Sequence, residues 1–141
     1  MKYISTRGGM SAAPYSAILL EGLATDGGLV VPETVPQVTP EQIESWRGLD
    51  YPQLAAEILS LYATDIPRED LDAMCRAAYS TDKFVSEQIV PVTPLEGASP
   101  IGQISLVGLS EGPTLAFKDM AMQFLGQALE YVLAQSDRTL N

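Results

Sequence analysis

Toward its C-terminal end the chain carries a regular series of apolar residues, which predicts a long helix over about residues 118–135. The series recurs at intervals of three or four residues, at Met122, Leu125, Leu129 and Val132. Further apolar residues lie between them, at Ala121, Phe124, Ala128 and Leu133. This spacing forms one broad apolar face on an α-helix. A face this wide must be buried, so we expect other elements to cover the helix on most sides.

The residues around this helix predict the start of an α/β domain. Residues 104–109 have the composition of a strand, and the Gly-Pro pair at 112–113 marks a tight loop. A strand, a loop and a helix form the first part of a βαβ unit, which needs a further strand to be complete. Ser136 would end the helix, and residues 139–141 would begin something new. We therefore expect a truncated domain.

The residues before Tyr79 predict a different, helix-rich region. A short edge strand opens the chain and enters a glycine turn. A helix follows from Pro14 and ends at Gly22. Residues 26–28 have the composition of a turn, and residues 29–32 form a brief extended segment.

Three further helix starts are predicted in this region. Thr39 and Gln42 form a capping box around Pro40, which suits the first helical position. A second helix runs from Asp50 to about residue 63. Its predicted apolar face consists of Leu54, Ile58, Leu61 and Tyr62. A third begins at residues 66–70, and its carboxylates Glu69, Asp70 and Asp72 are interpreted as a helix N-terminal turn and not as an acid/base pair.

Residues 89–95 are extended and punctuated by proline. The expected fold class is therefore α/β, mostly helical in this chain. We divide it into a helix-rich domain over residues 1–85 and the beginning of an α/β domain over residues 86–141.

Composition excludes several kinds of functional site. The chain has no histidine, so it has no Ser-His-Asp or Cys-His catalytic unit and no zinc site that uses imidazole. Its one cysteine, Cys75, can form neither an internal disulfide nor a four-cysteine metal site and is expected to be a small core or partly buried residue. We expect no metal site. The formal net charge of −10 argues against a nucleic-acid partner.

No apolar run approaches the ~18 residues that a membrane-spanning helix needs. An unpaired cysteine also agrees with a reducing compartment. We therefore expect a cytoplasmic protein with no membrane partner.

The candidate functional residue is Lys118, at the predicted start of the long helix. Burial and the positive end of the helix dipole would both favour the neutral amine, which covalent chemistry with an aldehyde cofactor requires. Asp119 would oppose this only if it pointed at the amine, and neighbouring side chains on a helix diverge. The plain alternative is a surface lysine that packs its stem and extends its charge into solvent.

The segment around Lys118 resembles the lysine segment of the threonine synthase family, whose members use pyridoxal 5'-phosphate. The resemblance rests on the string Gly112-Pro113-Thr114-Leu115-Ala116-Phe117-Lys118-Asp119. Residues 3–8, 26–32 and 92–95 are similar to further segments of that family, in the same order. One position departs from the pattern, because many members carry histidine where this chain has Glu111.

The resemblance implies a fold of the tryptophan synthase β type, that is, fold type II among pyridoxal-phosphate enzymes. It implies a lyase of threonine biosynthesis that converts O-phospho-L-homoserine and water into L-threonine and phosphate. Lys118 would be both the cofactor-binding residue, as an aldimine, and the catalytic base and acid at Cα and Cβ of the substrate. The family's phosphate-binding loop would follow residue 141, so we expect an N-terminal part of such an enzyme that is inactive alone and lacks its cofactor.

Two other interpretations stay open at this point. One is an acidic helical interaction module in which Lys118 is incidental. The other is a different enzyme of the same cofactor fold, such as a threonine dehydratase or a cysteine synthase. A cofactor lysine should lie buried or half-buried beside a cavity at the start of its helix, whereas an interaction module should have a closed core.

A weaker candidate is the turn at residues 6–9. Its glycines and Arg7 could present backbone N–H groups to an anion, although a surface turn with a solvated arginine is the favoured interpretation.

Overall fold

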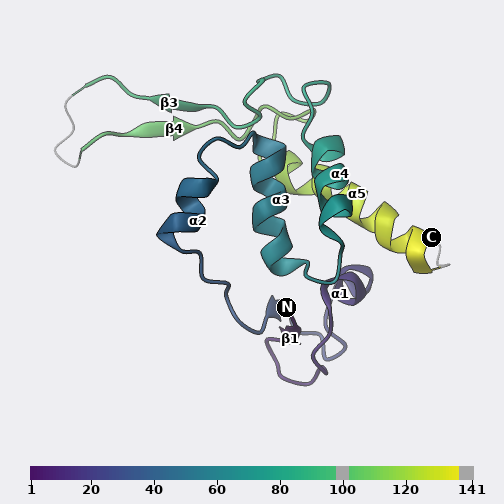
Figure 1. Cartoon of the computed structure of the whole chain (residues 1–141). Helices are drawn as coiled ribbons and strands as arrows, with labels where there is room; N and C mark the ends of the chain where they lie inside the picture. Colours follow the sequence, from purple (N-terminus) through teal and green to yellow (C-terminus); the bar gives the residue numbers. More distant parts are fainter. Residues whose placement is uncertain (98–101, 137–141) are drawn as a thin grey trace.

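The computed structural model describes residues 1–97 and 102–136, and it combines helices with two short pairs of strands (Figure 1). Strand β1 (Tyr3–Ser5) pairs antiparallel with β2 (Val30–Pro32). Between them lies helix α1 (Tyr15–Glu21), which ends at Gly22 with a φ of +72°. The predicted edge strand, helix and glycine stop are confirmed.

The next three helices begin close to their predicted starts. Helix α2 (Pro40–Ser45) has the complete capping box between Thr39 and Gln42. Helix α3 (Tyr51–Tyr62) begins with a second capping box that the sequence analysis did not identify, formed by Asp50 and Gln53. Helix α4 (Arg68–Ala78) carries two acidic residues in its first turn.

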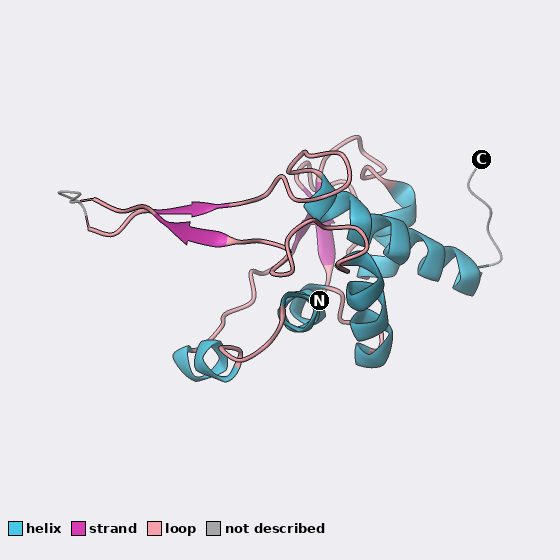
Figure 2. Cartoon of the chain, turned by 90° about the horizontal axis from the view of Figure 1, so that it is seen from above, coloured by secondary structure: helices cyan, strands magenta, loops and turns pink. Residues whose placement is uncertain are grey.

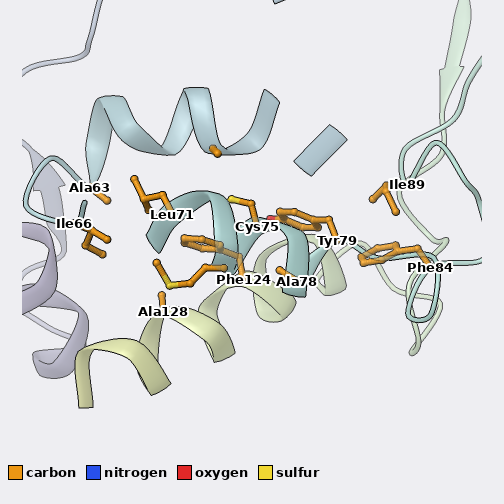
Figure 3. Close-up of a cluster of buried hydrophobic side chains, with 12 residues drawn as sticks. Ala63, Ile66, Leu71, Cys75, Ala78, Tyr79, Phe84, Ile89, Phe124 and Ala128 are labelled. Atoms are coloured by element: carbon orange, nitrogen blue, oxygen red, sulfur yellow. The ribbon is translucent and has the colours of Figure 1, made fainter. Parts of the chain in front are cut away.

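The core lies where α3, α4 and α5 (Asp119–Ser136) meet, as the close-up in Figure 3 shows. Several of its residues are small and fully buried: Ala56, Ala63, Cys75, Ala78 and Ala128 are each 0% exposed. Small side chains allow helices to approach closely, and larger side chains such as Leu71 and Phe124 fill the space between them. The predicted burial of Cys75 is confirmed.

The buried face of α3 is not the one that the apolar pattern predicted. Ala56 is its buried residue, and Ala55 and Leu59 pack against the core. Ile58, which was expected on the core face, is 43% exposed. The prediction was wrong because it weighted large apolar side chains, whereas the contact with α4 selects the alanine side of the helix.

Helix α5 begins and ends close to its predicted bounds, but it is covered on one side only. Its buried apolar residues are Phe124, Ala128 and Val132, at intervals of four. Met122, predicted to lie on the buried face, is 56% exposed. The expectation of cover on most sides is therefore wrong within the described part of the chain, because only α4 and α1 make substantial contact with α5 there.

Strands β3 (Val92–Pro94) and β4 (Ser105–Val107) form an antiparallel hairpin. The two extended segments were predicted, but their pairing was not. Both strands are exposed along their whole length, and the hairpin projects away from the helices in both views (Figures 1 and 2).

Among the described residues, no helix is both long enough and apolar enough to cross a membrane. The core cluster includes residues from both sides of the predicted boundary at residues 85–86, and the division into two domains stays a prediction. The new element expected at residues 139–141 lies outside the described residues.

Candidate functional site

Lys118 is the last residue before α5, as the sequence predicts. Its carbonyl oxygen accepts hydrogen bonds from the backbone N–H groups of Ala121 (3.1 Å) and Met122 (2.9 Å). Its backbone therefore belongs to the first turn of the helix. The side chain is exposed, and within the described part of the chain its ammonium group has no ion-pair partner. The amine thus projects from a defined helix start and is open to a ligand.

Asp119, the next residue, ties the preceding loop to the helix. The residue is only 3% exposed. Its Oδ2 atom accepts hydrogen bonds from the backbone N–H of Thr114 (2.8 Å) and from the Thr114 hydroxyl (2.9 Å). These two hydrogen bonds are called the Thr114–Asp119 clasp below. The carboxylate points at Thr114 and not at Lys118, which confirms the expected divergence of the two side chains.

Two backbone features shape the loop that the clasp closes. A Cβ atom on Gly112 would lie 2.6 Å from Oδ2 of Asp119, so a larger residue would displace the carboxylate. Leu115 has a φ of +57°, in the left-handed region that non-glycine residues rarely adopt. Its N–H donates to the Gly112 carbonyl over 3.0 Å. The clasp was not predicted from the sequence, although a threonine and an aspartate on either side of a predicted helix start could have indicated it.

The other end of the loop is attached to the body of the protein. The carbonyl of Glu111 accepts a hydrogen bond from the N–H of Val85 over 2.9 Å. This contact uses the backbone of Glu111, so it does not depend on which side chain occupies the position where many family members carry histidine.

Tyr79 supports the start of α5 from the side of α4. Its hydroxyl donates to the carbonyl of Met120 over 2.8 Å. Burial raises the pKa of Tyr79, so the hydroxyl remains protonated and keeps donating at neutral pH. Its ring lies edge-to-face against Tyr51, with 5.0 Å between the ring centroids. The helix start is therefore held by contacts on both sides of Lys118 in the sequence.

The expected burial of Lys118 beside a cavity is not observed. Large apolar neighbours that could desolvate the amine are themselves exposed, with Leu115 at 70%, Phe117 at 66% and Met122 at 56%. Two cavities that α5 helps to line lie farther along the helix: one of about 530 Å³ involves Leu125 and Leu129, and one of about 390 Å³ involves Tyr131 and Val132. The prediction fails because, among the described residues, no element packs over this face.

The turn at residues 6–9 does not hold an anion from outside, because a carboxylate of the chain already occupies it. Oδ2 of Asp26 accepts a hydrogen bond from the N–H of Gly9 over 2.7 Å. Arg7 donates from Nη1 to the carbonyl of Asp26 over 3.1 Å. The favoured interpretation as a surface turn holds, with its donors satisfied internally.

Cys75 and the carboxylates at the start of α4 have contacts that explain them as structural residues. Burial raises the pKa of the Cys75 thiol to about 11, so it stays protonated and unreactive at neutral pH. Asp70 accepts a hydrogen bond from the Tyr131 hydroxyl over 2.8 Å, and Asp72 pairs with Arg68 at 3.0 Å. Within residues 1–97 and 102–136, no group of three or more His, Cys, Asp or Glu side chains is placed to hold a metal ion.

Comparison with known sequences gives a consistent result over the whole chain. Residues 2–79 match the family model described as the threonine synthase N terminus. The chain is 50% identical to the threonine synthase of Corynebacterium glutamicum, in an alignment that covers 100% of this chain and 29% of that protein. It is 47% identical to the threonine synthase of Methylobacillus glycogenes, over 100% of this chain and 30% of that protein. The chain thus spans less than a third of the length of these relatives.

Solved structures agree with the sequence relatives. The pyridoxal-phosphate-bound threonine synthase from Brucella melitensis superposes with a TM-score of 0.87 at 40% identity, covering 98% of this chain and 28% of that one. The yeast threonine synthase superposes with a TM-score of 0.85 at 33% identity, covering 99% of this chain and 28% of that one.

Proposed function

The chain belongs to the threonine synthase family, and from this premise we propose that it carries the cofactor lysine of an enzyme that makes L-threonine. The proposed reaction converts O-phospho-L-homoserine and water into L-threonine and inorganic phosphate. The observation that carries the proposal is the position of Lys118, an exposed amine at the start of α5 behind a loop closed by the Thr114–Asp119 clasp.

Two features of the Lys118 segment fit pyridoxal 5'-phosphate as the cofactor, although the amine is not buried beside a cavity as the sequence predicts. A covalent bond to an aldehyde needs an accessible amine, and the Lys118 side chain is exposed with no ion-pair partner among the described residues. Exposed apolar side chains flank it, at Leu115 and Phe117, and these could pack against an aromatic ring. We further propose fold type II, the tryptophan synthase β type, for the protein to which this chain belongs, on the strength of its similarity to solved threonine synthases.

When bound, pyridoxal 5'-phosphate supplies a conjugated ring that accepts electrons from the substrate. The role proposed for Lys118 is to hold this group through Nζ and then to move protons at Cα and Cβ of the substrate. Phosphate leaves from Cγ, and water adds at Cβ. The hydrogen bonds that the Lys118 carbonyl accepts keep its backbone in place while the side chain moves.

The test is substitution of Lys118 in the holoenzyme. Lys118→Ala should lower threonine formation by at least ~100-fold, because a positioned acid–base group contributes about 10²–10⁴-fold. Lys2→Ala is the matched control, since Lys2 is also exposed but lies at the opposite end of the chain. Reduction with borohydride and peptide mass spectrometry should place the pyridoxal group on Lys118. Label on a different residue, or full activity of Lys118→Ala, would contradict the proposal.

We also propose a cytoplasmic location. The supporting observation is that Cys75 is free and buried, which agrees with a reducing compartment.

A further inference from the structure

We propose that Asp119 is a positioning residue for Lys118, acting through the Thr114–Asp119 clasp. This inference rests on the proposed function, since it assigns to Asp119 the task of holding the cofactor lysine in place. Asp119 itself points away from the amine, so its action is mechanical: it determines where the backbone of Lys118 lies and how firmly it is held.

Asp119 is a carboxylate in a buried position. It is the one charged residue that is buried among the described residues. Burying a carboxylate is costly unless hydrogen bonds compensate for the lost water. Here two donors from one residue, Thr114, converge on a single carboxylate oxygen. Such an arrangement specifies one geometry for the four residues between the donor and the acceptor.

The backbone of the loop also depends on Asp119. The absence of a side chain at Gly112 leaves the space that the Asp119 carboxylate occupies. Leu115 adopts a φ of +57°, a strained conformation that persists only where the surrounding structure enforces it. The clasp spans Leu115, so it supplies contacts that hold this backbone. Without the clasp we expect residues 112–118 to relax toward more common backbone conformations.

The backbone of Lys118 is held by hydrogen bonds on both sides, in the helix and in the loop. On the helix side its carbonyl is held by the N–H groups of Ala121 and Met122. On the loop side, the N–H of Asp119 donates to the carbonyl of Ala116 over 3.0 Å, and the clasp holds Thr114. Loss of the clasp removes the loop anchor, and the amine would then sample positions from which it cannot reach the cofactor or the substrate.

The experiment compares Asp119→Ala with Asp119→Asn, because the asparagine keeps one amide oxygen that can accept both hydrogen bonds from Thr114. One readout is the rate at which the cofactor-free protein attaches pyridoxal 5'-phosphate to Lys118, followed by borohydride reduction and mass spectrometry. The other is hydrogen exchange of the Thr114 amide before the cofactor is added. Glu69→Ala is the matched control, since Glu69 is an exposed carboxylate in the first turn of α4.

We expect Asp119→Ala to slow attachment by about 10- to 100-fold, since misplacing a reacting group by about 1 Å costs up to about 100-fold. Exchange of the Thr114 amide should accelerate in the same variant. Asp119→Asn should recover attachment to within about threefold of the wild type, and Glu69→Ala should change neither readout. A general loss of stability would not produce this rescue by asparagine.

Two results would overturn the inference, and they are distinguishable. Normal attachment by Asp119→Ala would remove the positioning role while leaving Lys118 as the cofactor residue. Absence of label on wild-type Lys118 would overturn the proposed function and, with it, the role of Asp119. If Asp119→Ala does not fold, Thr114→Val replaces it, because that variant loses only the hydroxyl donor of the clasp. Thr114→Ser, which keeps the hydroxyl, is then its control, and equal attachment rates in the two would refute the proposal.

Discussion

Asp26 accepts three hydrogen bonds that join the turn at residues 6–9 to the turn at residues 26–28. The donors are the hydroxyl of Ser5 (2.6 Å), the N–H of Gly9 (2.7 Å) and the N–H of Gly28 (2.9 Å). The hydrogen bond from Ser5, followed by that from Gly28, holds the pKa of this carboxyl below its ordinary value of 3.8. One side chain therefore organises the exit from β1 and the entry to β2.

This lowered pKa predicts a loss of stability in acid. Because the folded state binds the proton less tightly than the unfolded state, the contribution of Asp26 is fully present above about pH 4 and is lost as the pH falls through the lower folded pKa. Thermal unfolding midpoints measured between about pH 2 and pH 6 should fall less steeply in Asp26→Asn than in the wild type. Asp82→Asn changes an exposed carboxylate and should retain the wild-type slope. Identical slopes in all three proteins would refute the assignment.

At the scale of elements, helix α1 begins without a capping side chain of its own. Its cap residue is Pro14, and the free N–H groups of Tyr15 and Ser16 donate instead to the two carboxylate oxygens of Asp65, over 3.1 and 2.9 Å. Asp65 lies just after α3, so a residue far along the chain both caps α1 and attaches it to the core helices. Burial acts to raise the pKa of Asp65, but the hydrogen bonds from Ser16 and Tyr15 outweigh it and the pKa is lowered.

Asp65→Ala should lower the free energy of unfolding by about 0.5–2 kcal/mol, the usual cost of removing a helix N-cap. Chemical denaturation measures this value, and hydrogen exchange should accelerate at the amides of Tyr15 and Ser16. Asp65→Asn retains one acceptor oxygen of the two, so its effect should lie between those of the wild type and the alanine variant. An unchanged exchange rate at both amides in Asp65→Ala would contradict the capping role.

At the scale of the whole molecule, the three-helix core decides which side of α5 matters for stability. Phe124 is 6% exposed and packs in the core cluster, whereas Met122, on the same helix, is 56% exposed. Phe124→Ala should destabilise the protein by about 3–5 kcal/mol, the range for emptying a buried aromatic site. Met122→Ala should change the free energy of unfolding by no more than about 0.5 kcal/mol. Equal losses in denaturant unfolding would contradict the described packing.

The close approach of the helices gives a second prediction at this scale. Ala78 is 0% exposed in the core, and the adjacent Ala77 is exposed on the same helix. Ala78→Leu should cost about 1–3 kcal/mol because the core has no room for the added methyl groups. Ala77→Leu places the same side chain in solvent and should be nearly neutral. Equal free energies of unfolding for the two variants in denaturant would contradict the prediction.

Local signals predicted the element boundaries well. The capping box at Thr39 and Gln42, the stop at Gly22 and the start of α5 after Lys118 all depend on contacts within about four residues. Such contacts are encoded in adjacent sequence, so they can be identified without knowing the fold. The same holds for the candidate site, because Lys118 was identified from its own segment.

Tertiary structure alone decided which faces are buried and which distant groups meet. Ile58 and Met122 satisfy the helical apolar pattern yet face outward, because α3 and α4 meet through alanines and α5 contributes Phe124 instead. The spacing of apolar residues predicts that a helix has an apolar side, but the shapes of the neighbouring helices determine which side chains are buried. The sequence by itself therefore determined the elements and the candidate lysine. The fold determined the core and the cap from Asp65, since each of these joins groups that are far apart in the sequence and meet only through packing.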